Sequence, residues 1–192
     1  MLRIILFKIV IFIIDMKSYD YKTRQGIREI TWNDFHKMCK KLAGKISKSD
    51  FDLIIGVARA GLYPAVLIAG MLRKEIYPIR VTRRENDQIK YQEPVWKVNI
   101  PNVVNGKRVI IIDEIADSGS TLSKISQRLK NKGANSVETV VLVTHSWSKP
   151  KPNHYILESD ELIIFPWDKD ILVDDKWVLH PELKEAIKLQ KK

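Results

Sequence analysis

The chain has little cysteine and no cysteine pattern typical of a metal site. A single thiol, Cys39, excludes an internal disulfide, and the histidines add no zinc-type spacing. Cys39 falls on the apolar side of a helix-like pattern, which favours a core position over a nucleophile. Internal repeats and low-complexity linkers are also missing. The 192 residues are therefore expected to form one domain around one core.

One long apolar run is present, at residues 4–14. It is shorter than the roughly 20 residues that span a bilayer, it contains Lys8, and it lacks a small-residue cleavage site. We therefore expect a cytoplasmic protein without firm membrane association. The run could form an extra strand or an interfacial anchor. We favour the interpretation that residues 1–15 are an extension outside the working domain, which then occupies residues 16–192.

Acidic residues are outnumbered, with 23 Asp and Glu against 33 Lys and Arg, and the net charge is +10. Such a surplus suits an anionic partner, but a solvated basic surface explains it equally well. An obligatory nucleic-acid partner is not implied. The basic balance is compatible with a small, highly charged phosphate ligand, which would need local cations.

Helix-like and strand-like segments alternate along the chain. Thr31 and Asp34 resemble a helix start, and the apolar residues that follow have helical spacing. Continuous apolar strands that alternate with helices predict an α/β fold with a central, mainly parallel sheet covered on both faces. Ligands of such sheets bind beyond the carboxyl ends of the strands. The expected strands are 51–57, 76–82, 95–100, 109–112 and 137–143, and the expected helices begin near 32, 62 and 120.

The most informative segment is residues 109–122. Four apolar residues are followed by Asp113 and Glu114, then by a run of small and hydroxyl residues, and then by a helical pattern. Small residues let backbone N–H groups close around an anion, and a helix N-terminus adds its positive dipole end. The two acids can accept hydrogen bonds from sugar hydroxyls. The segment therefore suits a phosphate at one end and a ribose at the other.

This segment resembles the 5-phosphoribosyl-1-pyrophosphate (PRPP) motif of type I phosphoribosyltransferases, and every defining position is matched. The resemblance implies that fold, with a small hood. It implies that Asp113 and Glu114 hold the ribose and, directly or through water, Mg²⁺. It also implies that Asp117 assists proton transfer at the imidazole side of a base. The residues implied to wrap the 5′-phosphate are Asp117, Ser118, Gly119, Ser120 and Thr121.

Two other loops that follow strands resemble the family's pyrophosphate-binding segments. In the first, Arg59 would supply charge, and Ala60 and Gly61 would supply backbone amides. The family often has a cis peptide here, and the sequence leaves open whether the Arg59–Ala60 bond is cis. In the second, at residues 82–91, Arg83 and Arg84 are the expected cations of a loop that closes over pyrophosphate. The pattern does not choose between these two arginines.

Residues 145–170 resemble the hood of the purine branch, most closely that of xanthine–guanine and hypoxanthine–guanine phosphoribosyltransferases. Lys149 matches the lysine that reads the 6-oxo group, and Ile163 matches an isoleucine beside the base. Leu162 stands where that branch has tryptophan, so the identity of the base is left open.

The resemblance implies an enzyme that transfers a phosphoribosyl group from PRPP to guanine, xanthine or hypoxanthine in purine salvage and releases pyrophosphate. The implied cofactor is Mg²⁺, and the implied assembly is a homodimer or homotetramer. Two alternatives stay open at this point. The chain could be a PRPP-sensing regulatory protein that binds nucleic acid, or a phosphoribosyltransferase for another base, such as adenine or a pyrimidine.

Overall fold

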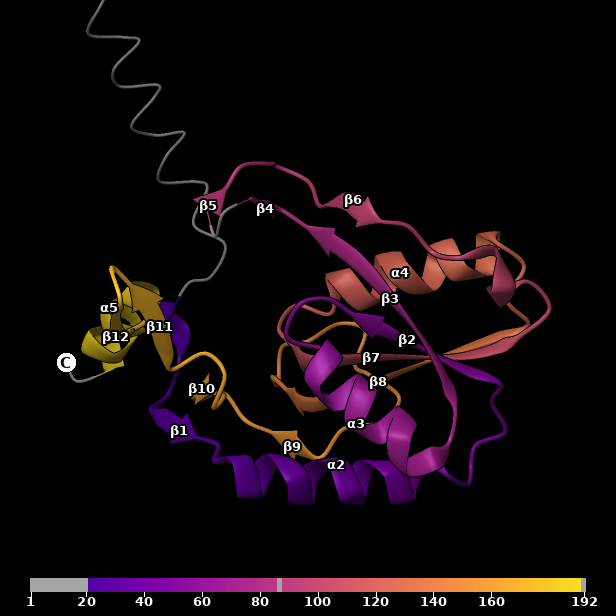
Figure 1. Ribbon diagram of the computed structural model, residues 1–192, viewed down its shortest axis with the longest axis horizontal. Helices are drawn as coiled ribbons and strands as arrows, with labels where there is room; N and C mark the ends of the chain where they lie inside the picture. Colours follow the sequence, from indigo (N-terminus) through magenta and orange to yellow (C-terminus); the bar gives the residue numbers. More distant parts are fainter. Residues whose placement is uncertain (1–20, 86–87, 191–192) are drawn as a thin grey trace, which may run out of the picture.

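The computed structural model describes residues 21–85 and 88–190 of the chain. The expected extension at 1–15 lies outside these residues. Six of the described strands form the central sheet, in the order β6-β3-β2-β7-β8-β9 (Figure 1). Their bounds are β2 Leu53–Val57, β3 Glu75–Thr82, β6 Val95–Val98, β7 Arg108–Ala116, β8 Ser136–Thr144 and β9 Leu157–Glu158.

The strands of this sheet are parallel except β6, which runs antiparallel to β3 at one edge. The predicted α/β architecture is thus confirmed, and the strand ends agree with the expected ones to within about two residues for most strands. The clearest difference is β7. Its hydrogen-bonded ladder with β8 continues through Asp113 to Ala116, so the two acids lie within the strand and not in the loop after it.

Alternate residues of β7 pack on opposite faces of the sheet. Ile110 and Ile112 pack with α2 (Trp32–Ile46) and α3 (Leu62–Leu72), whereas Val109 and Ile111 pack with α4 (Ser120–Asn131). Figure 1 shows α2 and α3 below the sheet and α4 above it. Because both faces are covered by helices, the central strands can be apolar at every position, which explains the continuous runs in the sequence.

The helix boundaries follow local capping chemistry. Thr31 and Asp34 form a reciprocal capping box at the start of α2: the Thr31 hydroxyl accepts from the Asp34 amide at 3.1 Å, and the Asp34 carboxylate accepts from the Thr31 amide at 3.3 Å. Helix α4 ends shortly before Gly133, whose φ of 87° suits glycine. These contacts fix where the loops beside the sheet begin and end.

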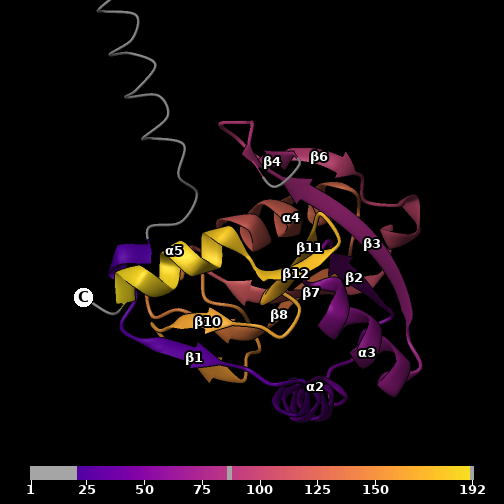
Figure 2. The same ribbon diagram turned by 60° about the vertical axis from the view of Figure 1, so that its left-hand side comes forward.

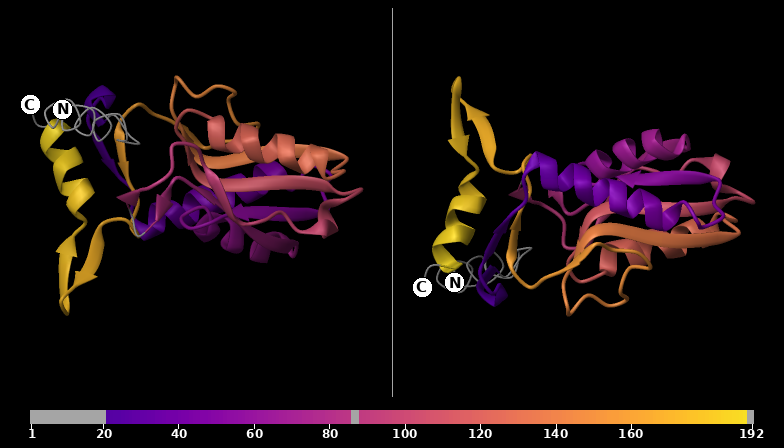
Figure 3. Two further views of the ribbon diagram at one scale, coloured as in Figure 1. Left: turned by 90° about the horizontal axis from the view of Figure 1, so that it is seen from above. Right: turned by 90° about the horizontal axis from the view of Figure 1, so that it is seen from below.

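The hood is built from both ends of the described chain. Strand β1 (Ile27–Glu29) pairs with β10 (Leu162–Ile164), and α5 (Pro181–Gln190) packs on β10 beside the short 3₁₀ helix η1 (Tyr21–Thr23) (Figure 2). The hairpin of β11 (Asp170–Val173) and β12 (Lys176–Leu179) projects from this end (Figure 3). The hood is therefore larger than residues 145–170. The remaining elements are β4 Arg84–Glu85, β5 Gln88–Ile89 and the 3₁₀ helix η2 Asn102–Val104.

The described residues include no helix that is both long and apolar enough to cross a membrane.

Helix α3 approaches the acidic end of β7 so closely that Gly61, at its N-terminus, touches Asp113. A Cβ atom on Gly61 would lie 2.5 Å from Asp113 Oδ1 and 2.6 Å from the carbonyl oxygen of Val57. The φ of Gly61 is −63°, which any residue adopts. Space, and not backbone conformation, therefore requires glycine at this position.

We predict that Gly61→Ala lowers the free energy of unfolding by about 1–3 kcal/mol, because the added methyl forces α3 away from β7. Chemical denaturation measures the change. Gly44→Ala is the matched control: Gly44 lies in the exposed part of α2, and a methyl group added there would have no neighbouring atom within 4 Å. That change should stabilise the protein by about 0.5–1 kcal/mol through helix propensity. A Gly61→Ala protein as stable as the wild type would contradict the steric account.

Candidate active site

The predicted phosphate loop lies between the end of β7 and the start of α4. Gly119 has a φ of 81°, and a Cβ there would lie 2.7–2.9 Å from the carbonyl oxygens of Pro150 and Lys149. The Ser118 hydroxyl accepts from the Ser120 amide at 3.3 Å. The loop borders a pocket of about 390 Å³ that is lined by 113–122, by 81–84 and by 92–94 together with Lys124. The backbone amides at the α4 N-terminus and nearby hydroxyls make this pocket suitable for an anion.

A second pocket, of about 280 Å³, lies between the sheet and the hood. Its walls mix apolar side chains of the hood with a few charged ones. Arg84, Glu114, Ile115 and Asp117 line both pockets, so the two spaces meet at the end of β7. The remaining lining residues are Tyr21, Arg24, Arg59, His145, Leu162, Ile163, Ile164, Phe165, Asp168, His180, Glu182 and Leu183.

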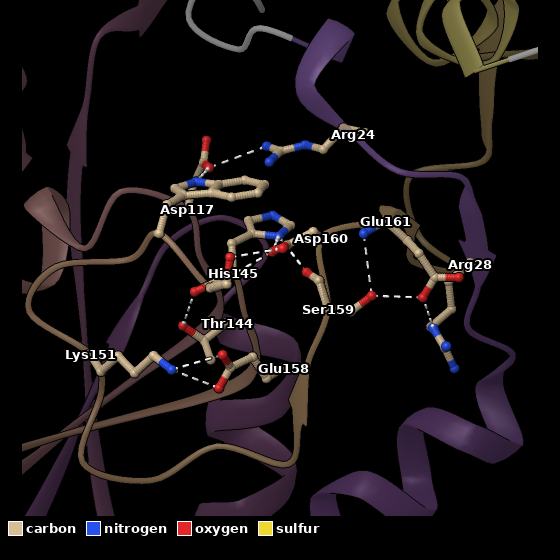
Figure 4. A network of polar contacts seen from close by, with 12 residues as sticks. Arg24, Arg28, Asp117, Thr144, His145, Lys151, Glu158, Ser159, Asp160 and Glu161 are labelled. Carbon is tan, nitrogen blue, oxygen red and sulfur yellow. Dashed lines mark hydrogen bonds and ion pairs between the residues drawn. The ribbon is translucent and has the colours of Figure 1, made fainter. Parts of the chain in front are cut away.

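Asp117 stands at this junction and is held through one of its two oxygens (Figure 4). Its Oδ1 accepts from Arg24 Nη2 at 3.2 Å and from Trp147 Nε1 at 3.1 Å. The Asp117 side chain is 30% exposed, whereas that of Arg24 is 6% exposed. The carboxylate is thus oriented by the protein on one side and open to the pockets on the other.

A stack of three side chains supports Asp117 from beneath. The Arg24 guanidinium lies 4.8 Å from the centre of the Trp147 ring, and that ring stacks on His145 at 4.5 Å. His145 Nδ1 donates to the carbonyl oxygen of Ser159 at 2.5 Å. Burial, and secondarily the charge of Arg24, lowers the pKa of His145, so its ring is neutral at pH 7. Asp160 holds the same turn by accepting from the amide and hydroxyl of Ser146.

The two acids of β7 are the most strongly perturbed carboxyls of the site. Burial raises the pKa of Asp113, whose Oδ1 accepts from the Glu114 amide at 2.9 Å. Burial and the adjacent Asp113 charge raise the pKa of Glu114 well above its usual value. A bound divalent ion would relieve the repulsion between their ionised forms. Adjacent carboxylate oxygens are also the ligand type that Mg²⁺ takes, so the residues fit that ion.

The first predicted pyrophosphate loop is only partly brought to the pockets. Arg59 is exposed and lines the hood pocket, but Ala60 and Gly61 line neither pocket. Gly61 instead supports Asp113 from behind. The non-proline cis peptide lies one bond earlier than the bond considered from the sequence, between Ala58 and Arg59.

Arg83 and Arg84 both line the phosphate-loop pocket, but their surroundings differ. Arg84 donates to both carboxylate oxygens of Glu182 in α5, at 2.7 and 2.8 Å, and Glu182 also accepts from the Tyr21 hydroxyl at 3.0 Å. The hydrogen bonds from Arg84, and to a smaller extent its charge, hold the pKa of Glu182 below its usual value. Arg83 lines only the phosphate-loop pocket, whereas Arg84 also lines the hood pocket and pairs with Glu182, so the position of Arg83 better suits a phosphate.

The predicted base-contacting residues separate into two groups. Leu162 and Ile163 lie in β10 and line the hood pocket. Lys149 is exposed and is outside the lining of either pocket, and its backbone instead donates to the carbonyl oxygen of Ser118 at 3.0 Å. The expected position of the Lys149 side chain beside a base is therefore not found. Lys149 contributes instead to the packing of the phosphate loop.

Several residues of the site were not identified from the sequence: Arg24, Asp168 and Glu182, which line the hood pocket, and Trp147, which donates to Asp117. The residue Asp168 as a whole is exposed, yet the protein around its carboxyl and the nearby Glu114 charge raise its pKa to about 6. Its position after Pro166-Trp167 was a usable signal. Arg24 and Glu182 gave none, because they come from segments outside the motifs and reach the site through contacts between distant parts of the chain.

A model of the phosphoribosyl transferase domain matches residues 31–173 of the chain. The chain belongs to this family. This phosphoribosyltransferase is accordingly a PRPP-dependent pentosyltransferase, and its fold is the type I fold expected from the motif.

The relatives of this phosphoribosyltransferase act, by name, on different bases. It is 28% identical over 145 residues to the xanthine-guanine phosphoribosyltransferase of Nitratidesulfovibrio vulgaris, covering 74% of this chain and 85% of that one. It is 26% identical over 136 residues to the adenine phosphoribosyltransferase of Petrotoga mobilis, covering 67% of this chain and 79% of that one. Among solved structures, the purine phosphoribosyltransferase of Pyrococcus horikoshii matches with a TM-score of 0.68 and 29% identity, covering 77% of this chain and 98% of that chain.

The raised pKa of Glu114 leads to a prediction about stability. The folded chain favours the protonated form of Glu114 more than the unfolded chain does. Protonated Glu114 therefore contributes stability to the fold below its unfolded pKa of about 4.3. That contribution is lost as the pH rises through the raised pKa of the folded state. Glutamine stays neutral, so Glu114→Gln should raise the free energy of unfolding at pH 7 without ligands. The difference from the wild type should shrink toward pH 4.

Denaturant titrations at several pH values test this. Glu93→Gln is the control, because Lys124 lowers the pKa of Glu93 and its neutralisation should not stabilise the protein at pH 7. If Glu114→Gln is no more stable than the wild type at pH 7, the ionised Glu114 carboxylate does not destabilise the folded state.

Proposed function

We propose that this phosphoribosyltransferase acts in purine salvage and transfers the phosphoribosyl group of PRPP to a 6-oxopurine: guanine, xanthine or hypoxanthine. The observation that carries this proposal is the position of Asp117, where the phosphate-loop pocket and the hood pocket meet. A ribose 5-phosphate in the first pocket and a base in the second would place the bond between them beside this carboxylate. The resemblance to the purine branch and the Pyrococcus structure support a purine.

In this proposal each part of the site has one task. Residues 117–121 bind the 5′-phosphate, Asp113 and Glu114 hold the ribose hydroxyls, and Arg83 and Arg59 face the pyrophosphate. Ile163 and Leu162 form an apolar wall for the base. Asp117 holds or accepts the proton of the imidazole nitrogen that does not receive the ribose.

The chemistry that these residues support is a displacement at C1 of the ribose with an oxocarbenium-like transition state. Pyrophosphate leaves with its bonding electron pair, and a base nitrogen forms the new bond. The protein contributes chiefly positioning and charge stabilisation. When bound, Mg²⁺ would neutralise pyrophosphate charge, with Asp113 and Glu114 holding it directly or through water. The oligomer and the cytoplasmic location implied by the resemblance stay predictions.

A panel of bases with PRPP and magnesium, followed by pyrophosphate release, tests the function. Guanine, hypoxanthine or xanthine should support release, and adenine, uracil and orotate should not. Efficient use of adenine would move the protein to another base specificity. Binding of PRPP without turnover of any base would favour the regulatory alternative.

We predict that Asp117→Asn lowers turnover by about 10²–10⁴-fold and changes PRPP affinity little. The amide keeps a hydrogen-bonding oxygen for Arg24 and Trp147 but cannot take a proton. Steady-state rates with hypoxanthine and PRPP binding by calorimetry measure the two effects. Unchanged turnover would exclude Asp117 as the proton acceptor.

A further inference from the structure

We infer that Arg24 reads the oxo group of the base and so selects a 6-oxopurine. This inference rests on the proposed function, because it names the residue that would set the base preference of that transfer. Arg24 precedes the segment that matches the family model, which begins at residue 31. It lies in the loop between η1 and β1 and lines the hood pocket, and Figure 4 shows its contact with Asp117.

The first argument is burial. The Arg24 side chain is 6% exposed, and a buried guanidinium is costly unless it is paired. Asp117 supplies the opposite charge at 3.2 Å, and the Trp147 ring supplies an aromatic face at 4.8 Å. These two contacts hold the guanidinium in one place at the edge of the pocket.

The second argument is the number of donors. A guanidinium has five N–H groups in a planar fork and no acceptor. In the described part of the chain, Arg24 uses one of its terminal nitrogens, Nη2, for Asp117 Oδ1. Within residues 21–85 and 88–190 the structure shows no other hydrogen-bond acceptor for the Arg24 guanidinium. The remaining N–H groups are therefore available to a ligand in the pocket that Arg24 lines.

The third argument is the shape of the purine edge. The imidazole nitrogen N7 and the 6-position are neighbours on one edge, and a free 6-oxopurine with its imidazole proton on N7 presents a donor at N7 and an acceptor at the 6-oxygen. A base oriented with N7 toward Asp117 has its 6-position toward the neighbouring Arg24. The carbonyl oxygen of guanine, xanthine or hypoxanthine would accept from the guanidinium. The amino group of adenine would instead present hydrogens to a group that only donates.

The position of Lys149 strengthens this assignment. Lys149 was the expected reader of the oxo group, but its side chain is exposed and lines neither pocket. Arg24 supplies a cation of the same donor type on the pocket side of Asp117. The recognition of the oxo group is thus assigned to the N-terminal part of the hood.

The test is the ratio of kcat/KM for hypoxanthine to kcat/KM for adenine, measured by pyrophosphate release. Arg24→Gln should lower this ratio by roughly 10- to 100-fold, because a glutamine amide pairs with the adenine edge as well as a guanidinium pairs with the oxo edge. Arg28→Gln is the matched control from the same segment, since Arg28 pairs with Glu161 at the surface. Arg28→Gln and Lys149→Ala should leave the ratio unchanged.

The ratio separates base reading from support of Asp117. Both bases carry N7, so loss of the Arg24–Asp117 contact slows both and leaves the ratio unchanged. An unchanged ratio in Arg24→Gln, or a ratio that falls in Lys149→Ala, overturns the inference. If Arg24→Gln does not fold, Arg24→Met answers the question: it fills a similar apolar volume but offers no donor to the oxo group, so the ratio should still fall, and an unchanged ratio overturns the inference.

Failure of the proposed function gives a different result. In that case the wild-type protein either uses adenine efficiently or binds PRPP without releasing pyrophosphate with any purine base, before any variant is compared.

Discussion

The site depends on one constraint, which is that a strand buried on both faces must present two carboxylates at its end. The apolar part of β7 has no exposed face, and Asp113 and Glu114 follow it while still within the hydrogen-bonded ladder. Their position is therefore as rigid as the core itself. The same position keeps both carboxyls largely out of water, which raises both pKa values, and the adjacent Asp113 charge raises that of Glu114 further. Gly61 lets α3 pack against this strand end without displacing it.

Asp117 is positioned in a different way. Side-chain donors, and not a sheet ladder, hold its carboxylate in place. Both of its protein donors reach the same oxygen, Oδ1. One consequence is that Oδ1 fixes the orientation of the carboxylate, whereas Oδ2 is the oxygen left for a ligand. Arg24 has the corresponding property among cations, because one of its nitrogens is held by Asp117 while the residue also lines the hood pocket. The pair thus forms a preorganised edge of alternating acceptor and donor.

The sequence predicted the sheet and the phosphate loop well because both leave periodic or local signals. Helix α3 begins at the expected residue, Leu62, and the expected helix start at Thr31 and Asp34 is the capping box of α2. The hood was predicted less well. The Arg24–Asp117 pair joins residues 93 positions apart, and the Tyr21–Glu182 pair joins residues 161 apart. Single charged residues at such distances produce no pattern, and a Lys-Pro dipeptide does not fix where the Lys149 side chain points.

The assembly of the hood from both ends of the described chain has a consequence for biosynthesis. The sheet, the phosphate loop and Asp117 are all nearly complete once residue 144 has been made, whereas α5 is the last described element to leave the ribosome. Domains generally fold as units. The hood pocket therefore cannot be complete until Glu182 and Leu183, near the end of the described chain, have been made.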